Sequence, residues 1–241
     1  MLRQRIFGIA AGYEDCNDHD SLSSDPMLKL SVGRAPISGE NLASQPTLSR
    51  LENSIGPTEL WRMEEVLLAG FITGLRGQPL KQLVIDADAT DDPTHGQQEL
   101  EFFHGFYDCH CFLPLLVYVS ADGGEQELVA SVLRPGNVHA GHRLVSVLKR
   151  IVPGLAEAFP NAEIVLRGDA GMASPAVYDF CEDAGVHYLL SLAKNSRLLS
   201  LGEEHLRDAR ARNDSADMAD AANELSVEGA LDVRDVNNRL M

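Results

Sequence analysis

Two carboxylates at the end of an apolar strand restrict the fold of this chain more than any other feature. Residues 81–96 read KQLVIDADATDDPTHG, and the apolar LVI triplet favours a buried β-strand. Because successive side chains of a strand alternate between its faces, Asp86 and Asp88 are expected on the same side. Carboxylates at such a position repel each other and resist burial, and a divalent cation would offset that cost. Hard oxygen ligands suit Mg²⁺ or Mn²⁺.

A second strand is expected to end in the same way. Residues 163–172 read EIVLRGDAGM, in which the apolar IVL triplet leads to Asp169, and a helix is expected to open at Pro175. If both strands belong to one sheet, Asp88 and Asp169 can meet at one cation. Asp91 and Asp92 precede Pro93, and for them an ordinary turn is the favoured interpretation.

These segments, together with LASQPTLSRLEN, FFHGFYDCHCFLPLLVYV and LRPGNVHAGH, resemble bacterial insertion-sequence transposases of the DDE class. The resemblance is to the transposase DDE domain of group 1 type, whose first acidic strand reads Asp-x-Asp-x-Thr-Asp, and it covers about residues 3–212. It implies an α/β fold with an RNase H-like mixed sheet and flanking helices, preceded by a small helical region. The residue pattern alone indicates only a mixed α/β chain.

The resemblance also implies a reaction, which is metal-dependent DNA strand cleavage and transfer during transposition of an insertion sequence. In that chemistry two Mg²⁺ or Mn²⁺ ions activate the attacking oxygen and stabilise the leaving one. Asp88 and Asp169 are the expected catalytic metal ligands. Asp86 is an alternative ligand or a partner of one, and Asp88 is preferred because Asp88-Ala89-Thr90 matches the Asp-x-Thr end of the family strand.

The expected partners are DNA, as transposon ends and target, and a second copy of the chain in a homodimer. Arg143, Lys194 and Arg197 are the candidate DNA contacts. For Arg143 a solvated loop and helix start is the favoured interpretation, and for Lys194 a plain surface role explains the residue about as well. The formal net charge of −16 opposes this prediction, since DNA-binding proteins usually carry a basic face. Four cysteines without paired spacing predict reduced thiols in a cytoplasm, and no apolar run predicts a membrane span.

Three regions are expected along the chain: a helical amino-terminal region at 1–80, an incomplete RNase H-like core at 81–200, and a helical or disordered acidic tail at 201–241. An amphipathic helix at 58–75 is expected to present Leu60, Met63, Leu67, Leu68 and Phe71 on its apolar face. The other expected elements are strands at 102–111, 113–120 and 126–133, a helix at 142–151, a strand at 164–169, a helix at 175–184 and a strand at 187–193.

The third acidic residue of the family, a Glu preceded by Tyr and Arg, has no counterpart in the sequence. The resemblance therefore leads to the expectation that the chain is a copy truncated at both ends and inactive in strand cleavage. Two alternatives stay open. One is a catalytically inactive remnant that binds DNA ends or dimerises, and the other is a different metal-dependent hydrolase with a two-Asp site.

Overall fold

The computed structural model describes residues 1–96, 98–193, 195–197, 200, 202–203 and 207. Its contacts divide the chain into a unit Met1–Leu190 and a unit Ser191–Met241. Most of the acidic tail predicted at 201–241 lies outside the described residues, and the three-region division stays a prediction. Among the residues that are described, no helix is both long and apolar enough to cross a membrane.

Short helices form the amino-terminal part of the first unit. They are α1 (Leu2–Ala10), the 3₁₀ turn η1 (Cys16–Asp18), α2 (His19–Leu22), α3 (Pro26–Ser31) and α4 (Gln45–Asn53). Helix α3 has a capped start: the Asp25 carboxylate accepts the Leu28 N–H at 2.7 Å, and Pro26 fills the first helical position.

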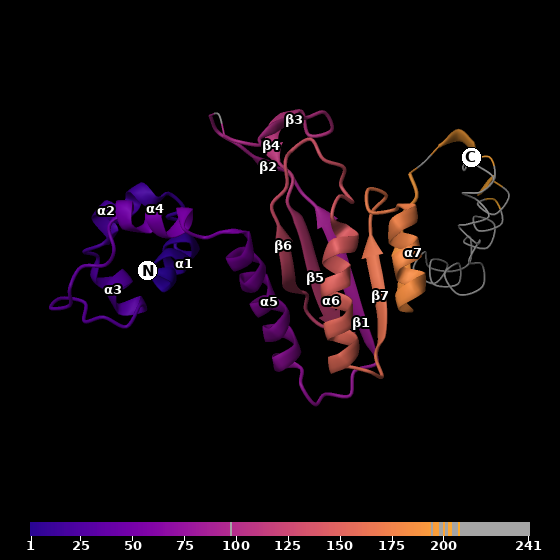
Figure 1. Cartoon of the computed structure of the whole chain (residues 1–241), viewed down its shortest axis with the longest axis horizontal. Helices are drawn as coiled ribbons and strands as arrows, with labels where there is room; N and C mark the ends of the chain where they lie inside the picture. The colour runs from indigo at the N-terminus through magenta and orange to yellow at the C-terminus, as the bar shows by residue number, and fades with distance from the viewer. Residues whose placement is uncertain (97, 194, 198–199, 201, 204–206, 208–241) are drawn as a thin grey trace. The chain divides into compact units, whose positions relative to one another are not determined.

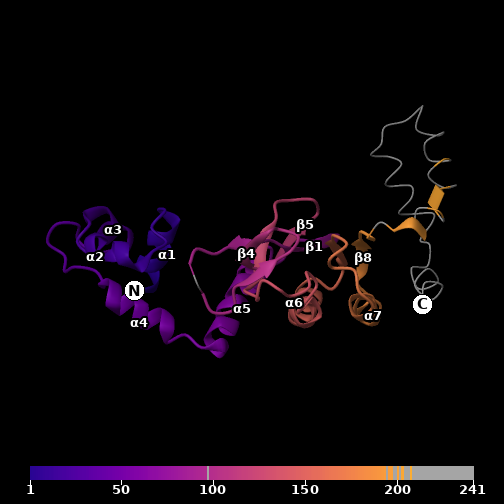
Figure 2. The ribbon, with the colours of Figure 1, turned by 90° about the horizontal axis from the view of Figure 1, so that it is seen from above.

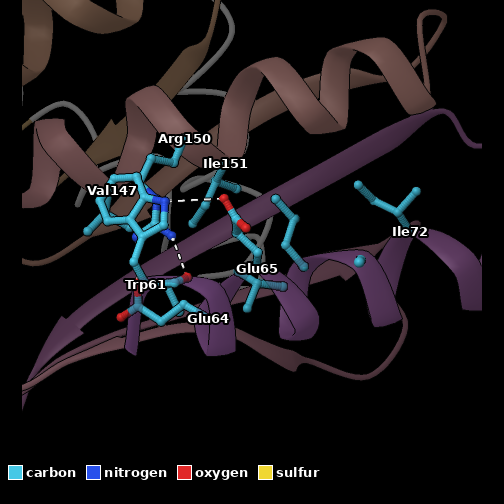
Figure 3. Close-up of a pocket in the computed structure, with 11 residues that line it drawn as sticks. Trp61, Glu64, Glu65, Ile72, Val147, Arg150 and Ile151 are labelled. Atoms are coloured by element: carbon cyan, nitrogen blue, oxygen red, sulfur yellow. Dashed lines mark hydrogen bonds and ion pairs between the residues drawn. The ribbon is translucent and has the colours of Figure 1, made fainter. Parts of the chain in front are cut away.

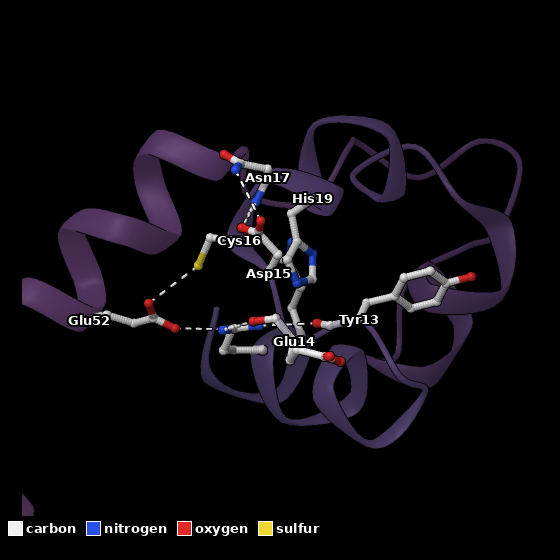
Figure 4. A network of polar contacts seen from close by, with 9 residues as sticks. Tyr13, Glu14, Asp15, Cys16, Asn17, His19 and Glu52 are labelled. Atoms are coloured by element: carbon white, nitrogen blue, oxygen red, sulfur yellow. Dashed lines mark hydrogen bonds and ion pairs between the residues drawn. The ribbon is translucent and has the colours of Figure 1, made fainter. Parts of the chain in front are cut away.

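A polar network ties these short helices together (Figure 4). The Arg5 guanidinium lies 2.5 Å from a Glu52 carboxylate oxygen and also donates to the carbonyls of Tyr13 and Glu14. The hydrogen bond from Arg5 lowers the pKa of Glu52. The Cys16 thiol donates to the other Glu52 oxygen at 3.3 Å. This part of the chain is therefore held by side-chain polar contacts as well as by buried leucines.

Helix α5 (Pro57–Gly74) confirms the predicted helix, but its predicted apolar face is correct only at Leu68 and Phe71. Phe71 is 2% exposed, whereas Leu60 and Met63 are 56% and 43% exposed. The helix packs on strand β6 (Glu127–Val132) through Leu68 and Ile72 as well as Phe71. Because apolar residues occur around most of this helix, their spacing alone does not select the packed side.

The main sheet has five strands in the order β6-β5-β1-β7-β8 (Figure 1). Its remaining strands are β1 (Gln82–Ala89), β5 (Leu115–Ala121), β7 (Glu163–Gly168) and β8 (His187–Leu190). Strand β5 is antiparallel to both β1 and β6, and β7 is parallel to both β1 and β8. Three antiparallel strands followed by helix–strand pairs form the predicted α/β, RNase H-like order, which is thereby confirmed.

Helices α5, α6 (Leu144–Ala158) and α7 (Pro175–Ala184) contribute to one apolar core with the same face of this sheet (Figure 2). Helix α6 continues through Pro153, beyond the end predicted at residue 151. Along β1, Leu83, Ile85 and Ala87 are buried, and the residues between them are half-buried or exposed. Asp86 and Asp88 therefore lie on the opposite face from the described helices, as the alternation predicted.

The strand predicted at 102–111 is wrong, because two strands occupy it. They are β3 (Phe102–His104) and β4 (Cys109–Phe112), which pair with each other and, through β4, with β2 (Asp92–Pro93) in a separate sheet. The turn between β3 and β4 includes Asp108, whose φ of 54° is left-handed. Aromatic residues on both sides of Gly105 concealed this turn. The turn prediction for Asp92 is also wrong, since Asp92 pairs with Phe112.

Candidate metal centre

The register of two parallel strands brings the predicted ligands to one edge of the sheet. Ala87 of β1 lies opposite Gly168 of β7, and the next residues are Asp88 and Asp169. Both aspartates are exposed. Because successive residues of a strand alternate between its faces, Asp88 projects to the face that α5, α6 and α7 leave open, and Asp169 directly follows the paired residue Gly168.

Tyr107, in the turn between β3 and β4, lies beside the same strand end. Its hydroxyl donates to the Ala89 carbonyl at 3.2 Å. The pKa of Tyr107 is raised first by burial and then by the negative charges of Asp91, Asp88 and Asp169. These three carboxylates therefore act on one phenol, so their charges gather at this end of the sheet. Sequence reasoning missed Tyr107, whose aromatic neighbours made it look like a strand residue.

Each predicted ligand is oriented by a main-chain hydrogen bond. Oδ1 of Asp88 accepts the Ala89 N–H at 2.8 Å, and Oδ1 of Asp169 accepts the Gly171 N–H at 2.9 Å. Within the described residues, neither Oδ2 atom accepts a hydrogen bond, so each carboxylate keeps an oxygen for another ligand. The donor chemistry fits a divalent cation, since Mg²⁺ is commonly held by one or two carboxylates together with waters and substrate phosphates.

The candidate metal centre has few side chains that could ligate an ion. Over the ranges that the structure describes, no group of three or more His, Cys, Asp and Glu side chains is arranged to hold a metal ion. Two carboxylates therefore carry the candidate centre, with Asp91 as a third nearby charge.

Asp86, the alternative ligand, has a different environment. The guanidinium of Arg167 contacts both of its oxygens, at 2.5 Å from Nε to Oδ1 and 2.9 Å from Nη2 to Oδ2. The Gln126 amide also donates to Oδ2 at 2.6 Å. Asp86 is thus already satisfied by protein donors. The sequence could have indicated the Asp86–Arg167 pair. Each of these residues lies two positions before a predicted ligand, Asp88 or Asp169, so aligning the two strand ends also sets Asp86 beside Arg167.

The sequence model of the family described as transposase DDE domain group 1 matches residues 1–229. The chain belongs to this family. This match confirms the predicted family, whose members generally use divalent metal ions. A comparison with curated proteins gives no match.

Solved structures of similar proteins include transposases. The catalytic domain of Mos1 mariner transposase is 12% identical, with a TM-score of 0.31, and the match covers 77% of this chain and 82% of that one. A Drosophila P element transposase strand transfer complex is 11% identical, with a TM-score of 0.34 and coverage of 78% and 44%. A simian T-cell lymphotropic virus intasome is 13% identical, with a TM-score of 0.30 and coverage of 61% and 47%. The chain thus spans about half the length of several of these matches.

The basic residues predicted for a DDE-family DNA site have different placements. Arg143 is exposed and immediately precedes α6, with a left-handed φ of 67°. Arg197 is exposed in the second unit, and Lys194 lies outside the described residues. Of the three, Arg143 alone belongs to a described part of the same unit as Asp88 and Asp169.

A separate cavity of about 340 Å³ lies between α5, β6 and α6 (Figure 3). The Arg150 guanidinium lies 3.2 Å from the centroid of the Trp61 ring and 2.5 Å from a Glu64 oxygen. These contacts join α5 to α6. The Asp86 and Asp88 side chains project from the opposite face of the sheet, so this cavity is not part of the candidate metal centre.

Proposed function

We propose that the chain is a DDE transposase domain that acts on DNA by metal-dependent phosphoryl transfer, with Asp88 and Asp169 as metal ligands. The observation that supports this proposal is the register that sets Ala87 opposite Gly168, the two residues that directly precede Asp88 and Asp169. The metal is Mg²⁺ or Mn²⁺, and the complete site takes two ions. A bound divalent cation supplies Lewis-acid stabilisation of the charge that develops on phosphate oxygens.

The chain's own groups have distinct tasks in this proposal. Asp88 and Asp169 each offer an oxygen from a carboxylate that a main-chain N–H orients. Asp86 orients Arg167, and with its oxygens engaged it supports the site rather than joining it. The Tyr107 hydroxyl fixes the turn between β3 and β4 against the end of β1.

DNA, as transposon ends and target, is the proposed partner, and Arg143, Lys194 and Arg197 are the proposed phosphate contacts. Arg143 is supported by its exposure and by its place ahead of α6. A net charge of −16 weakens general attraction to DNA, so binding would depend on local cations at the carboxylate centre. The chain's origin from a bacterial insertion sequence belongs to the same proposal.

We further propose that residues 1–241 by themselves do not cleave DNA, because two carboxylates are too few to fix two ions. Magnesium-dependent nicking of a supercoiled plasmid carrying the DNA that flanks the gene measures this. We expect DNA binding without nicking. Robust nicking that is lost in Asp169→Ala would contradict the proposed inactivity and confirm the catalytic role. The alternative function, an inactive remnant that binds DNA ends or dimerises, shares the expectation of no nicking.

The effect of a divalent cation on the stability of the fold tests the proposed metal centre. A ligand that binds only the folded state stabilises it by mass action, by about 2.7 kcal/mol at a hundredfold excess over Kd. Millimolar Mn²⁺ is therefore expected to raise the melting temperature of the chain. Asp169→Asn should abolish the rise, whereas Asp183→Asn, at an exposed position of α7, should retain it. The same melting temperature for the unaltered chain with and without Mn²⁺ would refute the centre.

A homodimer is the second proposed partnership, and α5 supports it. Five large apolar side chains of this helix are exposed: Leu60, Trp61, Met63, Val66 and Leu67, at 56%, 48%, 43%, 68% and 39%. Pairing of two such helices would remove this apolar stripe from water.

A further inference from the structure

Arg134, just after β6, is a fully buried arginine that the reaction chemistry does not use. It is 1% exposed. Its Nε donates to the Leu113 carbonyl at 2.7 Å, and its Nη1 donates to the carbonyls of Ala140 and His142, each at 2.7 Å. One guanidinium therefore fastens the loop 140–142 to the chain that enters β5.

Retaining a cation at this position is costly. Burial, together with the nearby charge of Arg143, lowers the pKa of Arg134 to about 10, so the group stays charged at neutral pH. Its Nη2 is buried with no hydrogen-bond partner in the described part of the chain. An apolar residue would avoid these costs, but it would also release three carbonyls that now have a donor.

The loop that Arg134 holds lies directly on the turn that carries Asp169. A Cβ added to Gly171 would be 2.7 Å from the Ala140 Cβ, and one added to Gly141 would be 2.9 Å from the Gly171 carbonyl oxygen. The Gly171 N–H is the group that orients Oδ1 of Asp169. Contacts therefore run without a gap from Arg134 through Ala140 to Gly171 and Asp169.

We infer that Arg134 is a positioning residue: through the loop 140–142 it fixes the Gly171 N–H and thereby the direction of the Asp169 carboxylate. This inference deepens the proposed function and rests on it, since orientation matters only if Asp169 holds a ligand. The same loop leads into Arg143, so Arg134 also sets a proposed phosphate contact relative to that carboxylate.

Glycine at 171 gives the first test, in the full chain. The Gly171 backbone does not have a left-handed φ, so alanine is hindered only by its neighbours. Gly171→Ala should weaken Mn²⁺ binding, measured by calorimetry, by about tenfold through the Ala140 contact, a coupling of the size seen between touching residues. Ala140→Gly combined with Gly171→Ala should restore most of the affinity. If the double variant binds as weakly as Gly171→Ala, the added methyl acts directly on Asp169, and the role of the loop is refuted.

Arg134→Lys gives the second test, because lysine keeps the charge but lacks the fork that reaches three carbonyls. Without metal, hydrogen exchange of the Gly171 amide, followed by NMR, should speed up by about tenfold or more as this hydrogen bond opens. Mn²⁺ affinity should fall with it. Arg150→Met, which removes a partly buried arginine that joins α5 to α6, should lower the melting temperature but leave both readouts unchanged.

The outcomes separate the two proposals. If the unaltered chain binds Mn²⁺ but Arg134→Lys changes neither Gly171 exchange nor affinity, the positioning role is wrong and the metal centre stands. If the unaltered chain binds no Mn²⁺, the proposed centre fails; faster Gly171 exchange in Arg134→Lys would then still confirm the mechanical link. An unchanged exchange rate in that case would refute both.

Discussion

Asp86 and Asp88 share one face of one strand, yet their surroundings assign them different roles. Arg167 and Gln126 occupy the oxygens of Asp86, whereas Asp88 accepts a single main-chain hydrogen bond. A carboxylate that already has charged and amide donors gains little from a cation, and displacing those donors costs their hydrogen bonds. The distinction is therefore one of hydrogen-bond partners, which residue order alone does not reveal.

Asp86→Asn and Asp88→Asn should accordingly behave differently. Asp86→Asn is expected to lower stability by at most about 1 kcal/mol, since Arg167 is half-exposed and solvent screens the pair. It should retain the Mn²⁺-dependent rise in melting temperature, which Asp88→Asn should lose. Thermal unfolding followed by circular dichroism, with and without Mn²⁺, measures both. A loss of the metal response in Asp86→Asn would make Asp86 a ligand.

The burial of His19 leads us to expect that the stability of the helical amino-terminal part depends on pH. Its ring is fully buried, its Nδ1 lies 3.3 Å from the Gln4 amide nitrogen, and its Nε2 has no described partner. Burial, and then the charge of Arg5, lowers the pKa of His19. The folded state thus takes up its proton at lower pH than the unfolded state does. The stability that His19 contributes is complete above its unfolded pKa of about 6.5 and is lost as pH falls below it.

We therefore expect the melting temperature to fall between pH 7.5 and pH 5.5, with part of that fall absent in His19→Gln. The pKa of Glu52, lowered by Arg5, adds a loss of the same sign at still lower pH. His187→Gln, which alters an exposed histidine of β8, is the control and should keep the full pH dependence. An equal fall in the His19→Gln chain would assign the effect to other groups.

At the scale of elements, the sequence predicted the strands and helices that carry a single clear period. Strands β1 and β7 were predictable because each has a short apolar run that is followed by polar residues, directly by Asp86 in β1 and by Arg167 in β7. The turn inside 102–111 was not, because aromatic residues continue through it. Arg134 was equally concealed: a Pro-Gly loop predicts exposed arginine, and only the fold brings three carbonyls to it.

Helix α5 offers a prediction about its two sides. Phe71→Ala removes a side chain from the core and should cost about 3–5 kcal/mol of stability. Met63→Glu, on the exposed stripe, should leave the melting temperature nearly unchanged and shift the chain toward monomer in light scattering after size exclusion. If the unaltered chain is monomeric at high concentration, the proposed dimer is wrong, whatever Met63→Glu does.

At the scale of the whole molecule, the net negative charge of the chain opposes binding to the proposed partner, DNA. A chain of net charge −16 repels a polyanion, so a cation held between protein carboxylates and DNA phosphates would be needed to bring them together. This predicts that divalent metal strengthens DNA binding, whereas it would weaken binding that relied on basic side chains alone, because added salt screens such contacts.

Charge-neutralising substitutions separate metal bridging from general electrostatics, because with Mn²⁺ present the two predict opposite changes in the affinity for DNA. Asp88→Asn and Asp169→Asn each remove one negative charge, so general electrostatics predicts tighter binding of a fluorescent DNA duplex, with or without metal. Metal bridging predicts that the gain from millimolar Mn²⁺, measured by fluorescence anisotropy at constant ionic strength, disappears in both variants. Asp183→Asn removes the same charge from an exposed position of α7 and should keep the full gain. If all three variants bind DNA more tightly and respond equally to Mn²⁺, the two aspartates contribute only charge, and the bridging role assigned to them is wrong.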